Sequence, residues 1–118
     1  MLFDQSNPIY IQIGELICEN ILKGIWKEGE RLPSEREFAI SMEVNPNTVN
    51  RTYTTLQEKN IIFNQRGIGY FVSPGAENMV LQMQKEVFIE EELPRIIKKL
   101  KLLKISLEDF TQLYSISD

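Results

Sequence analysis

The spacing of apolar residues near the start of the chain is that of an amphipathic helix. The apolar side chains that fall on one stripe between residues 8 and 24 are Ile9, Ile13, Leu16, Ile17 and Ile21. They recur with the helical period of about 3.6 residues. Pro8, in the first turn, and Gly24, after the last apolar position, mark where this helix is expected to begin and end.

Two shorter helices follow, and each opens with a cap. Ser34 and Glu37 have the spacing of a capping box, in which each side chain satisfies the exposed backbone N–H of the other. Asn45 is suited to the N-cap of the next helix, with Pro46 at its first position, where a missing N–H costs nothing. The residues expected to face the core from these two helices are Phe38, Ala39, Met42, Val49, Thr52, Tyr53 and Leu56.

After Asn60 the apolar period shortens from helical to about two residues. The segments "IIFNQ" and "YFVSP" are rich in β-branched and aromatic residues, and "RGIG" separates them. Two glycines in so short a connection allow the tight backbone of a hairpin. Three helices followed by a hairpin predict a fold that is mainly α with a small β-hairpin, in the order of a winged helix-turn-helix.

Residues 77–118 return to a helical pattern, with Pro94 expected to kink or restart the helix and Ser106 to cap a last one. So short a tail cannot bury two apolar stripes within itself. We therefore predict a winged helix-turn-helix domain at 8–76 and a helical dimerisation tail at 77–118, although the tail could instead pack back on its own domain. The predicted interface residues are Met79, Val80, Met83, Val87, Phe88, Ile96, Leu100 and Leu103.

Composition removes several classes of function. The chain has one cysteine, Cys18, and no histidine, which excludes an internal disulfide, most zinc sites and histidine-dependent triads. We predict no metal, no cofactor and no enzymatic activity, and an inert thiol at Cys18. Without a membrane-length apolar run or a signal peptide, the expected location is the cytoplasm, with no membrane partner.

The outward face of the third helix, by contrast, is unusual for a solvated surface. No carboxylate occurs between residues 44 and 57, where amides and hydroxyls surround one arginine. Amides pair with adenine, arginine with guanine, and threonine with thymine in the major groove of DNA. The net charge of −4 argues weakly against a nucleic-acid partner, so a prediction of DNA binding rests on the local arrangement of residues. The predicted contacts on or near this face are Ser34, Arg36, Asn45, Asn47, Thr48, Asn50, Arg51 and Thr54, joined by Arg66, Gly67 and Gly69 of the wing.

The motifs "LPSERE", "NTVNRTY" and "RGIGYFV" occur in this order, and the chain resembles the DNA-binding domain of the GntR family of bacterial transcription regulators. The short tail and "VNPNTV" resemble its YtrA-like subgroup. The resemblance implies a homodimeric repressor of an operon, such as a transporter operon, that binds a palindromic operator in double-stranded DNA. It also implies base and phosphate contacts at Ser34, Arg36, Asn47, Thr48 and Arg51 and in the wing.

A different function stays open at the level of sequence. The third helix could bind another protein through its amides and hydroxyls, in a winged-helix interaction module that does not recognise a DNA sequence. The sequence leaves the operator, the direction of regulation and any small-molecule effector undetermined. Binding to duplex DNA in moderate salt distinguishes the two functions.

Overall fold

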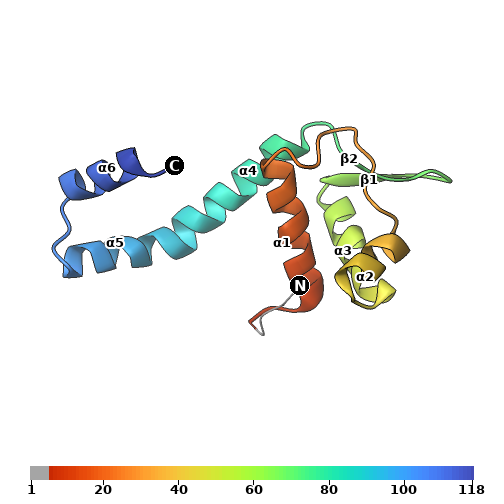
Figure 1. Cartoon of the computed structure of the whole chain (residues 1–118), viewed down its shortest axis with the longest axis horizontal. Helices are drawn as coiled ribbons and strands as arrows, with labels where there is room; N and C mark the ends of the chain where they lie inside the picture. Colours follow the sequence, from red (N-terminus) through yellow and green to blue (C-terminus); the bar gives the residue numbers. More distant parts are fainter. Residues whose placement is uncertain (1–5) are drawn as a thin grey trace. The chain divides into compact units, whose positions relative to one another are not determined.

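The computed structural model describes residues 6–118 (Figure 1). In chain order the elements are α1 (Ile9–Leu22), α2 (Glu35–Met42), α3 (Pro46–Glu58), β1 (Ile62–Gln65), β2 (Gly69–Val72), α4 (Ala76–Val87), the π-helical turn η1 (Phe88–Glu92), α5 (Leu93–Leu102) and α6 (Leu107–Ile116). The chain divides into two compact units, of which the first ends at Gln82 and the second begins at Met83. The predicted fold class, a mostly helical protein with one hairpin, is confirmed.

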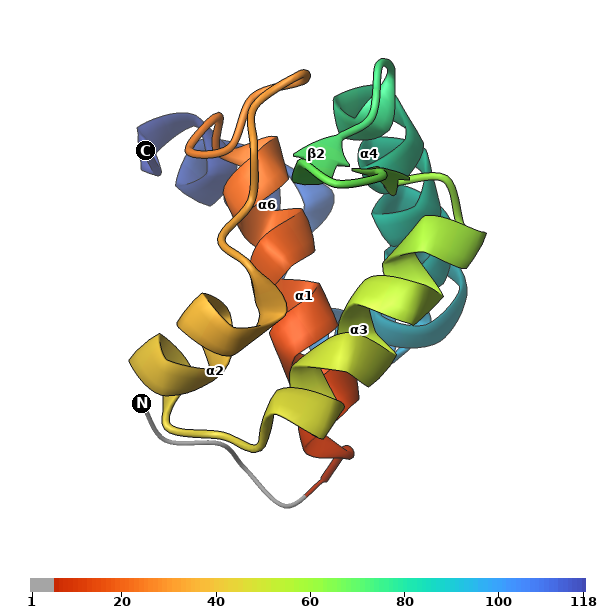
Figure 2. The ribbon, with the colours of Figure 1, turned by 90° about the vertical axis from the view of Figure 1, so that its right-hand side faces the viewer.

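The first unit is built around α3, which packs against both α1 and α2 (Figure 2). Val49, Tyr53 and Thr52 are almost completely buried, as their helical spacing predicts. On α1 the inner stripe begins later than expected, because Ile9 is exposed while Ile13 and Ile17 are buried. The contact between α1 and α3 is close, since a side chain on Gly14 would meet the methyl group of Thr52.

The predicted caps are confirmed. The backbone N–H of Glu37 donates to Oγ of Ser34 (3.1 Å), and the backbone N–H of Ser34 donates to Oε1 of Glu37 (3.0 Å). Hydrogen bonds from the backbone and then the side chain of Ser34 lower the pKa of Glu37, because they favour the carboxylate. At the start of α3 the side chain of Asn45 accepts from the backbone N–H of Asn47 (2.8 Å). Both helices therefore begin where local chemistry places them.

The hairpin pairs β1 with β2 in antiparallel register, with Ile62 opposite Val72 and Gln65 opposite Gly69. Asn60, shortly before β1, has the left-handed conformation (φ 62°), which asparagine adopts more readily than most residues. Arg31, in the segment before α2, forms an isolated antiparallel bridge with Phe71. Strand β2 therefore has a pairing partner along both of its edges.

In the second unit the helix does not stop at Pro94. The chain instead passes through the wider turn η1 directly before α5, where the missing N–H and the ring of proline are accommodated. The last helix has the predicted capping box between Ser106 and Asp109. Of the described residues from Met83 onward, none is buried.

One part of the predicted interface is wrong. Val80, on the first turns of α4, is 1% exposed and belongs to the core of the first unit, so it offers no surface to a second chain. Met79 beside it is partly buried against the same core. The boundary between the compact units accordingly lies after Gln82, within α4.

Candidate nucleic-acid interface

The N-terminal half of α3 presents the polar face that its sequence predicts. Because Val49, Thr52 and Tyr53 hold the inner face in the core, the side chains two positions away from each of them lie on the opposite side of the helix and point outward. The predicted contact residues that are exposed on this helix and at its cap are Asn45, Asn47, Asn50, Arg51 and Thr54, and Thr48 is half-buried. The face is therefore open to a partner while its backbone is fixed from behind.

Arg51 is held by a residue of α1. Its guanidinium carbon lies 3.9 Å from the centroid of the Tyr10 ring, within the range of a cation–π contact. Its Nη2 atom also lies 3.3 Å from the hydroxyl oxygen of Tyr10, to which it donates. The central arginine of the face thus has a defined position in the free protein.

Glu35, at the start of α2, approaches the same face from the side. The amide nitrogen of Asn50 donates a hydrogen bond to its carboxylate, and the charge of Glu35 also acts on Tyr70 of the wing. Burial, then the charge of Glu35, raises the pKa of Tyr70. The sequence of α3 contains no carboxylate in this region, so only tertiary structure reveals this negative charge. Glu35 orients the side chain of Asn50 through the amide nitrogen, and the amide oxygen of Asn50 takes no part in this hydrogen bond.

At the start of α2, Ser34 and Arg36 lie at a helix N-terminus, where backbone dipoles favour anions. An Oγ lone pair of Ser34 is occupied by the cap, but its hydroxyl proton is still able to donate. Arg36 is exposed. Glu35 and Glu37 in the same turn reduce the positive potential, so the anion-binding character of this end depends on Arg36.

The wing carries Arg66 at its exposed turn, followed by two glycines with positive φ, Gly67 at 79° and Gly69 at 145°. Gly69 also lies against the side chain of Arg31. A Cβ atom there would lie 2.9 Å from Nε of Arg31, whose guanidinium group occupies the space beside the glycine. Arg31 therefore joins Arg66 on the wing.

Sequence reasoning missed Arg31 as a candidate contact. The signal was present but weak. Arg31 precedes "LPSERE" in an extended segment, and it becomes part of the wing only because that segment pairs with β2. Within the described residues the only ion pair is Lys23 with Glu19, so no carboxylate holds Arg31, Arg36, Arg51 or Arg66 in a salt bridge. These four arginines are available to an anionic partner.

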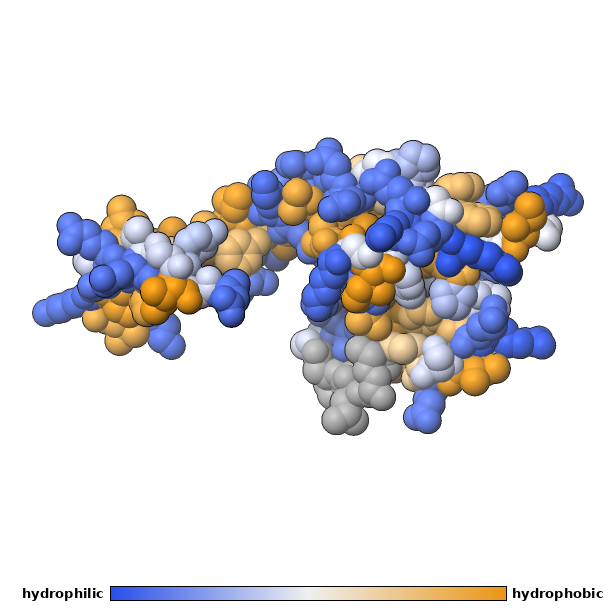
Figure 3. All heavy atoms as spheres, turned by 45° about the horizontal axis from the view of Figure 1, so that its top comes forward, coloured by the Kyte–Doolittle hydropathy of each residue, from blue (hydrophilic) through white to orange (hydrophobic). Residues whose placement is uncertain are grey.

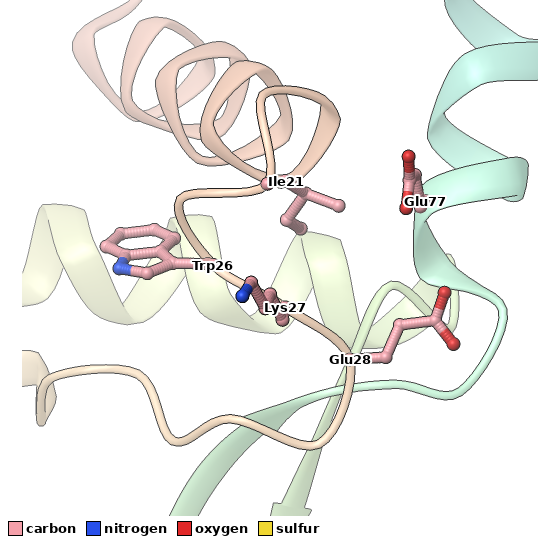
Figure 4. A pocket seen from close by; sticks show the side chains of 6 residues that line it. Ile21, Trp26, Lys27, Glu28 and Glu77 are labelled. Carbon is pink, nitrogen blue, oxygen red and sulfur yellow. The ribbon is translucent and has the colours of Figure 1, made fainter.

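A cavity of about 290 Å³ lies elsewhere in the first unit, after α1 (Figure 4). Ile21 and Trp26 line it together with Lys27, Glu28 and Glu77. Glu28 is already engaged, because its Oε1 accepts from the backbone N–H of Gly75 at 2.7 Å. This bond ties the loop after α1 to the start of α4, which gives these residues a structural role.

The described residues contain no group of histidine, cysteine, aspartate and glutamate side chains arranged to hold a metal ion. Burial raises the pKa of Cys18, which keeps the thiol protonated and poorly nucleophilic. No helix in residues 6–118 is both long and apolar enough to span a bilayer.

Comparison with known proteins agrees with this geometry. Residues 9–72 match the family model described as bacterial regulatory proteins, gntR family. The chain is 34% identical over 110 residues to YhcF, an HTH-type transcriptional regulator of Bacillus subtilis, covering 93% of this chain and 89% of that protein. It is 41% identical over 92 residues to the HTH-type transcriptional repressor YtrA of Bacillus subtilis, covering 78% of this chain and 70% of that repressor.

Solved structures share the fold. A GntR-family transcriptional regulator from Bacteroides thetaiotaomicron superposes with a TM-score of 0.74 at 41% identity, over 92% of this chain and 94% of that one. The DNA-binding domain of AraR, solved in complex with operator ORX1, superposes with a TM-score of 0.57 at 25% identity, over 61% of this chain and 93% of that one.

Proposed function

The chain belongs to the gntR family of bacterial regulatory proteins, and from this premise we propose that it is a homodimeric repressor of transcription that binds a palindromic operator in the cytoplasm. It is a transcription regulator with a DNA-binding domain, as its relatives are, and not an enzyme. In the proposed complex α3 enters the major groove and the wing reaches the adjacent minor groove. The repressor role is supported by the similarity to YtrA.

The observation that carries this proposal is the exposed polar face of α3. Arg51 and Asn50 project from a helix whose opposite side is fixed in the core, which is the arrangement that direct base readout requires. Both side chains are also oriented by neighbours, Arg51 by Tyr10 and Asn50 by Glu35. A face that served only to be hydrated would not need such positioning.

Phosphate contacts are assigned to the arginines around this face. Arg31 and Arg66 on the wing and Arg36 on α2 are exposed and free of carboxylate partners among the described residues. If each of these arginines neutralises one phosphate, a dimer neutralises about six, and the logarithm of the binding constant falls with the logarithm of salt concentration with a slope of about −5. A slope steeper than about −9 would mean that a large part of the interface is not included.

Dimerisation is assigned to the second unit. Its helices expose apolar side chains along their length, visible as orange atoms among blue ones on the tail (Figure 3). A monomer rarely leaves so much apolar surface in water, and a twofold homodimer is the simplest way to cover it. The exposed or half-buried residues that remain interface candidates are Met83, Val87, Phe88, Ile96, Leu100 and Leu103.

Selection of binding sites from random duplex DNA tests the proposal. The unmodified protein should enrich an inverted repeat, because two protomers related by a twofold axis read the same half-site in opposite directions. Arg51→Ala should lose preference at one position in each half-site, at a cost of about 1 to 3 kcal/mol there. Arg95→Ala is the matched control, since Arg95 is an exposed arginine outside the winged-helix unit.

The opposite result has a definite meaning. If the unmodified protein enriches no sequence at low salt, α3 does not read bases, and the polar face belongs to the alternative function, a contact with another protein. Glu35 beside Asn50 and the net charge of −4 are the two observations that favour this alternative.

A further inference from the structure

We propose that Tyr10 is a positioning residue for Arg51, which sets the plane of its guanidinium before DNA is bound and so contributes to sequence specificity. Tyr10 lies on α1, outside the helices that the family's motifs place at the DNA, and it is 41 positions away from Arg51 in the chain. The inference rests on the proposed function, because it assigns Tyr10 a part in base reading by α3.

Two contacts fix the arginine side chain. The ring of Tyr10 lies 3.9 Å from the guanidinium carbon, and the hydroxyl group accepts a hydrogen bond from Nη2 at 3.3 Å. The ring restricts the plane of the guanidinium, and the hydroxyl restricts its rotation within that plane. Arginine reads guanine through two parallel hydrogen bonds, so the orientation of this plane decides whether both bonds form.

Tyr10 is itself anchored to the residue next to Arg51. The hydroxyl of Thr52, which is buried, donates to the backbone carbonyl of Tyr10 at 2.8 Å. The methyl group of Thr52 lies beside Gly14, one turn further along α1. The part of α1 that carries Tyr10 is therefore held in register with the part of α3 that carries Arg51.

The chemistry of the partner also matters. Glutamate or aspartate would orient Arg51 but would neutralise its charge and compete with DNA for its N–H groups. A tyrosine ring holds the cation without cancelling the charge. Guanidinium has five N–H donors, and the hydrogen bond to Tyr10 uses one of them. A side chain that is already ordered loses less conformational freedom when it binds.

The experiment uses the full-length protein and two duplexes. One duplex carries the site that the unmodified protein selects, and the other changes the single base pair at which Arg51→Ala loses preference. Fluorescence anisotropy gives the affinity for each duplex, and their ratio measures discrimination at that base pair. The variants are Tyr10→Leu, Tyr10→Phe, Arg51→Ala and the double variant Tyr10→Leu/Arg51→Ala, with Ile11→Ala as an exposed control on the same helix.

We expect Tyr10→Leu to lower discrimination about fivefold to tenfold, with little change in binding to the altered duplex. Tyr10→Phe, which keeps the ring, should retain most of the discrimination of the unmodified protein. The double variant should be no worse than Arg51→Ala, because Tyr10 acts through Arg51. Ile11→Ala should match the unmodified protein, and thermal unfolding should show that all variants remain folded.

Three results would overturn the inference. Unchanged discrimination in Tyr10→Leu would show that the ring does not position Arg51. A gain in affinity would show that Tyr10 holds Arg51 away from the base. Additive losses in the double variant would show that Tyr10 makes an independent contact. Each leaves the proposed function standing, because the unmodified protein would still select a sequence; failure of that selection is the separate result that removes the proposed function.

Discussion

The two compact units use amphipathic helices in opposite ways. In the first unit the apolar faces of α1 and α3 meet, and residues such as Ile13, Val49 and Tyr53 have no exposed surface. In the second unit the helices have equally clear apolar stripes, but Val87, Leu103 and Leu113 are each more than half exposed. The same sequence pattern thus completes a core in one unit and leaves a surface without a partner in the other.

Local structure does not distinguish the two units. Each contains a helix opened by a complete capping box, Ser34 with Glu37 in the first and Ser106 with Asp109 in the second. Caps and periodicity specify helices, whereas a stable fold also needs apolar surface removed from water. The difference teaches that the first unit contains its own source of stability, and we expect the second to need another surface.

The largest expected effect comes from separating the units. A fragment ending at Gln82 should unfold cooperatively, because it keeps the whole buried core. A peptide of residues 83–118 should lose most of its helical signal on dilution, since none of its residues is buried and helices without tertiary packing are marginal in water. Far-UV circular dichroism over a range of concentrations checks both. A tail peptide that stays helical at every dilution would show that this unit is stable alone.

A single charge in the tail should have the next largest effect. Ile96 is exposed on the apolar side of α5, and Ile96→Asp would bury a carboxylate in the proposed interface. We expect the dissociation constant of the full-length dimer to rise more than about 100-fold, measured by sedimentation equilibrium. Lys98→Asp is the matched control, because it changes the charge of the same helix on its polar side. An unaltered dimer in Ile96→Asp would exclude this face from the interface.

In the first unit, two glycines of the wing allow a sharper comparison. Gly69→Ala would place a Cβ atom 2.9 Å from Nε of Arg31 and push that arginine from its place, whereas a Cβ at Gly67 would have no atom within 4 Å other than those of its chain neighbours. We expect Gly69→Ala to weaken DNA binding about tenfold and to reduce the salt slope of the dimer by about 2. Gly67→Ala should add only backbone strain, about 1 kcal/mol.

Anisotropy titrations at several salt concentrations measure both glycine variants. Equal salt slopes in the two variants would mean that Arg31 makes no contact with phosphate. In that case the requirement for glycine at position 69 would concern the fold of the wing alone.

The smallest effect concerns one hydroxyl group in the core. Tyr53 donates to the carbonyl oxygen of Pro33 at 2.8 Å, so Tyr53→Phe should lower the free energy of unfolding by about 1 kcal/mol at neutral pH. Burial, reinforced by Glu35, raises the pKa of Tyr53 above its ordinary value of 10. Folding therefore favours the neutral phenol, and the stability linked to it is complete below pH 10 and lost as the pH rises through the raised pKa.

Urea unfolding at neutral and alkaline pH measures this difference. The free energy of unfolding should fall above pH 10 in the unmodified protein and fall less in Tyr53→Phe, so the two curves converge. Tyr114→Phe is the control in the other unit, where the tyrosine is 75% exposed. Parallel curves for Tyr53→Phe and the unmodified protein would contradict the role of the buried hydroxyl.

Sequence alone predicts the features of this molecule that depend on neighbouring residues. Asn45 with Pro46 determines where α3 begins, and the period of its apolar residues determines which side is exposed, so the polar face follows without a structure. Asn60 in the left-handed conformation is a local property of the same kind. These signals act over a few residues, and tertiary packing does not override them.

Features that join segments far apart in the chain could not be predicted from the sequence. Tyr10 meets Arg51 across 41 positions, Glu35 meets Asn50 across 15, and Arg31 lies beside Gly69 only because its segment pairs with the hairpin. Val80 has the spacing of an interface residue, yet it completes the core of the first unit. Periodicity shows that a side chain is apolar and on one face, but not which surface covers it.

The central claim is that the first unit binds DNA and the second unit forms the dimer. Its most direct test is the mass of the protein–DNA complex at saturation, measured by native mass spectrometry on a duplex that carries the selected site. We expect two chains on each duplex, because one twofold dimer occupies both half-sites. A single chain on each duplex at saturation would contradict the account, since the winged helix would then bind DNA without the pairing that the exposed tail requires.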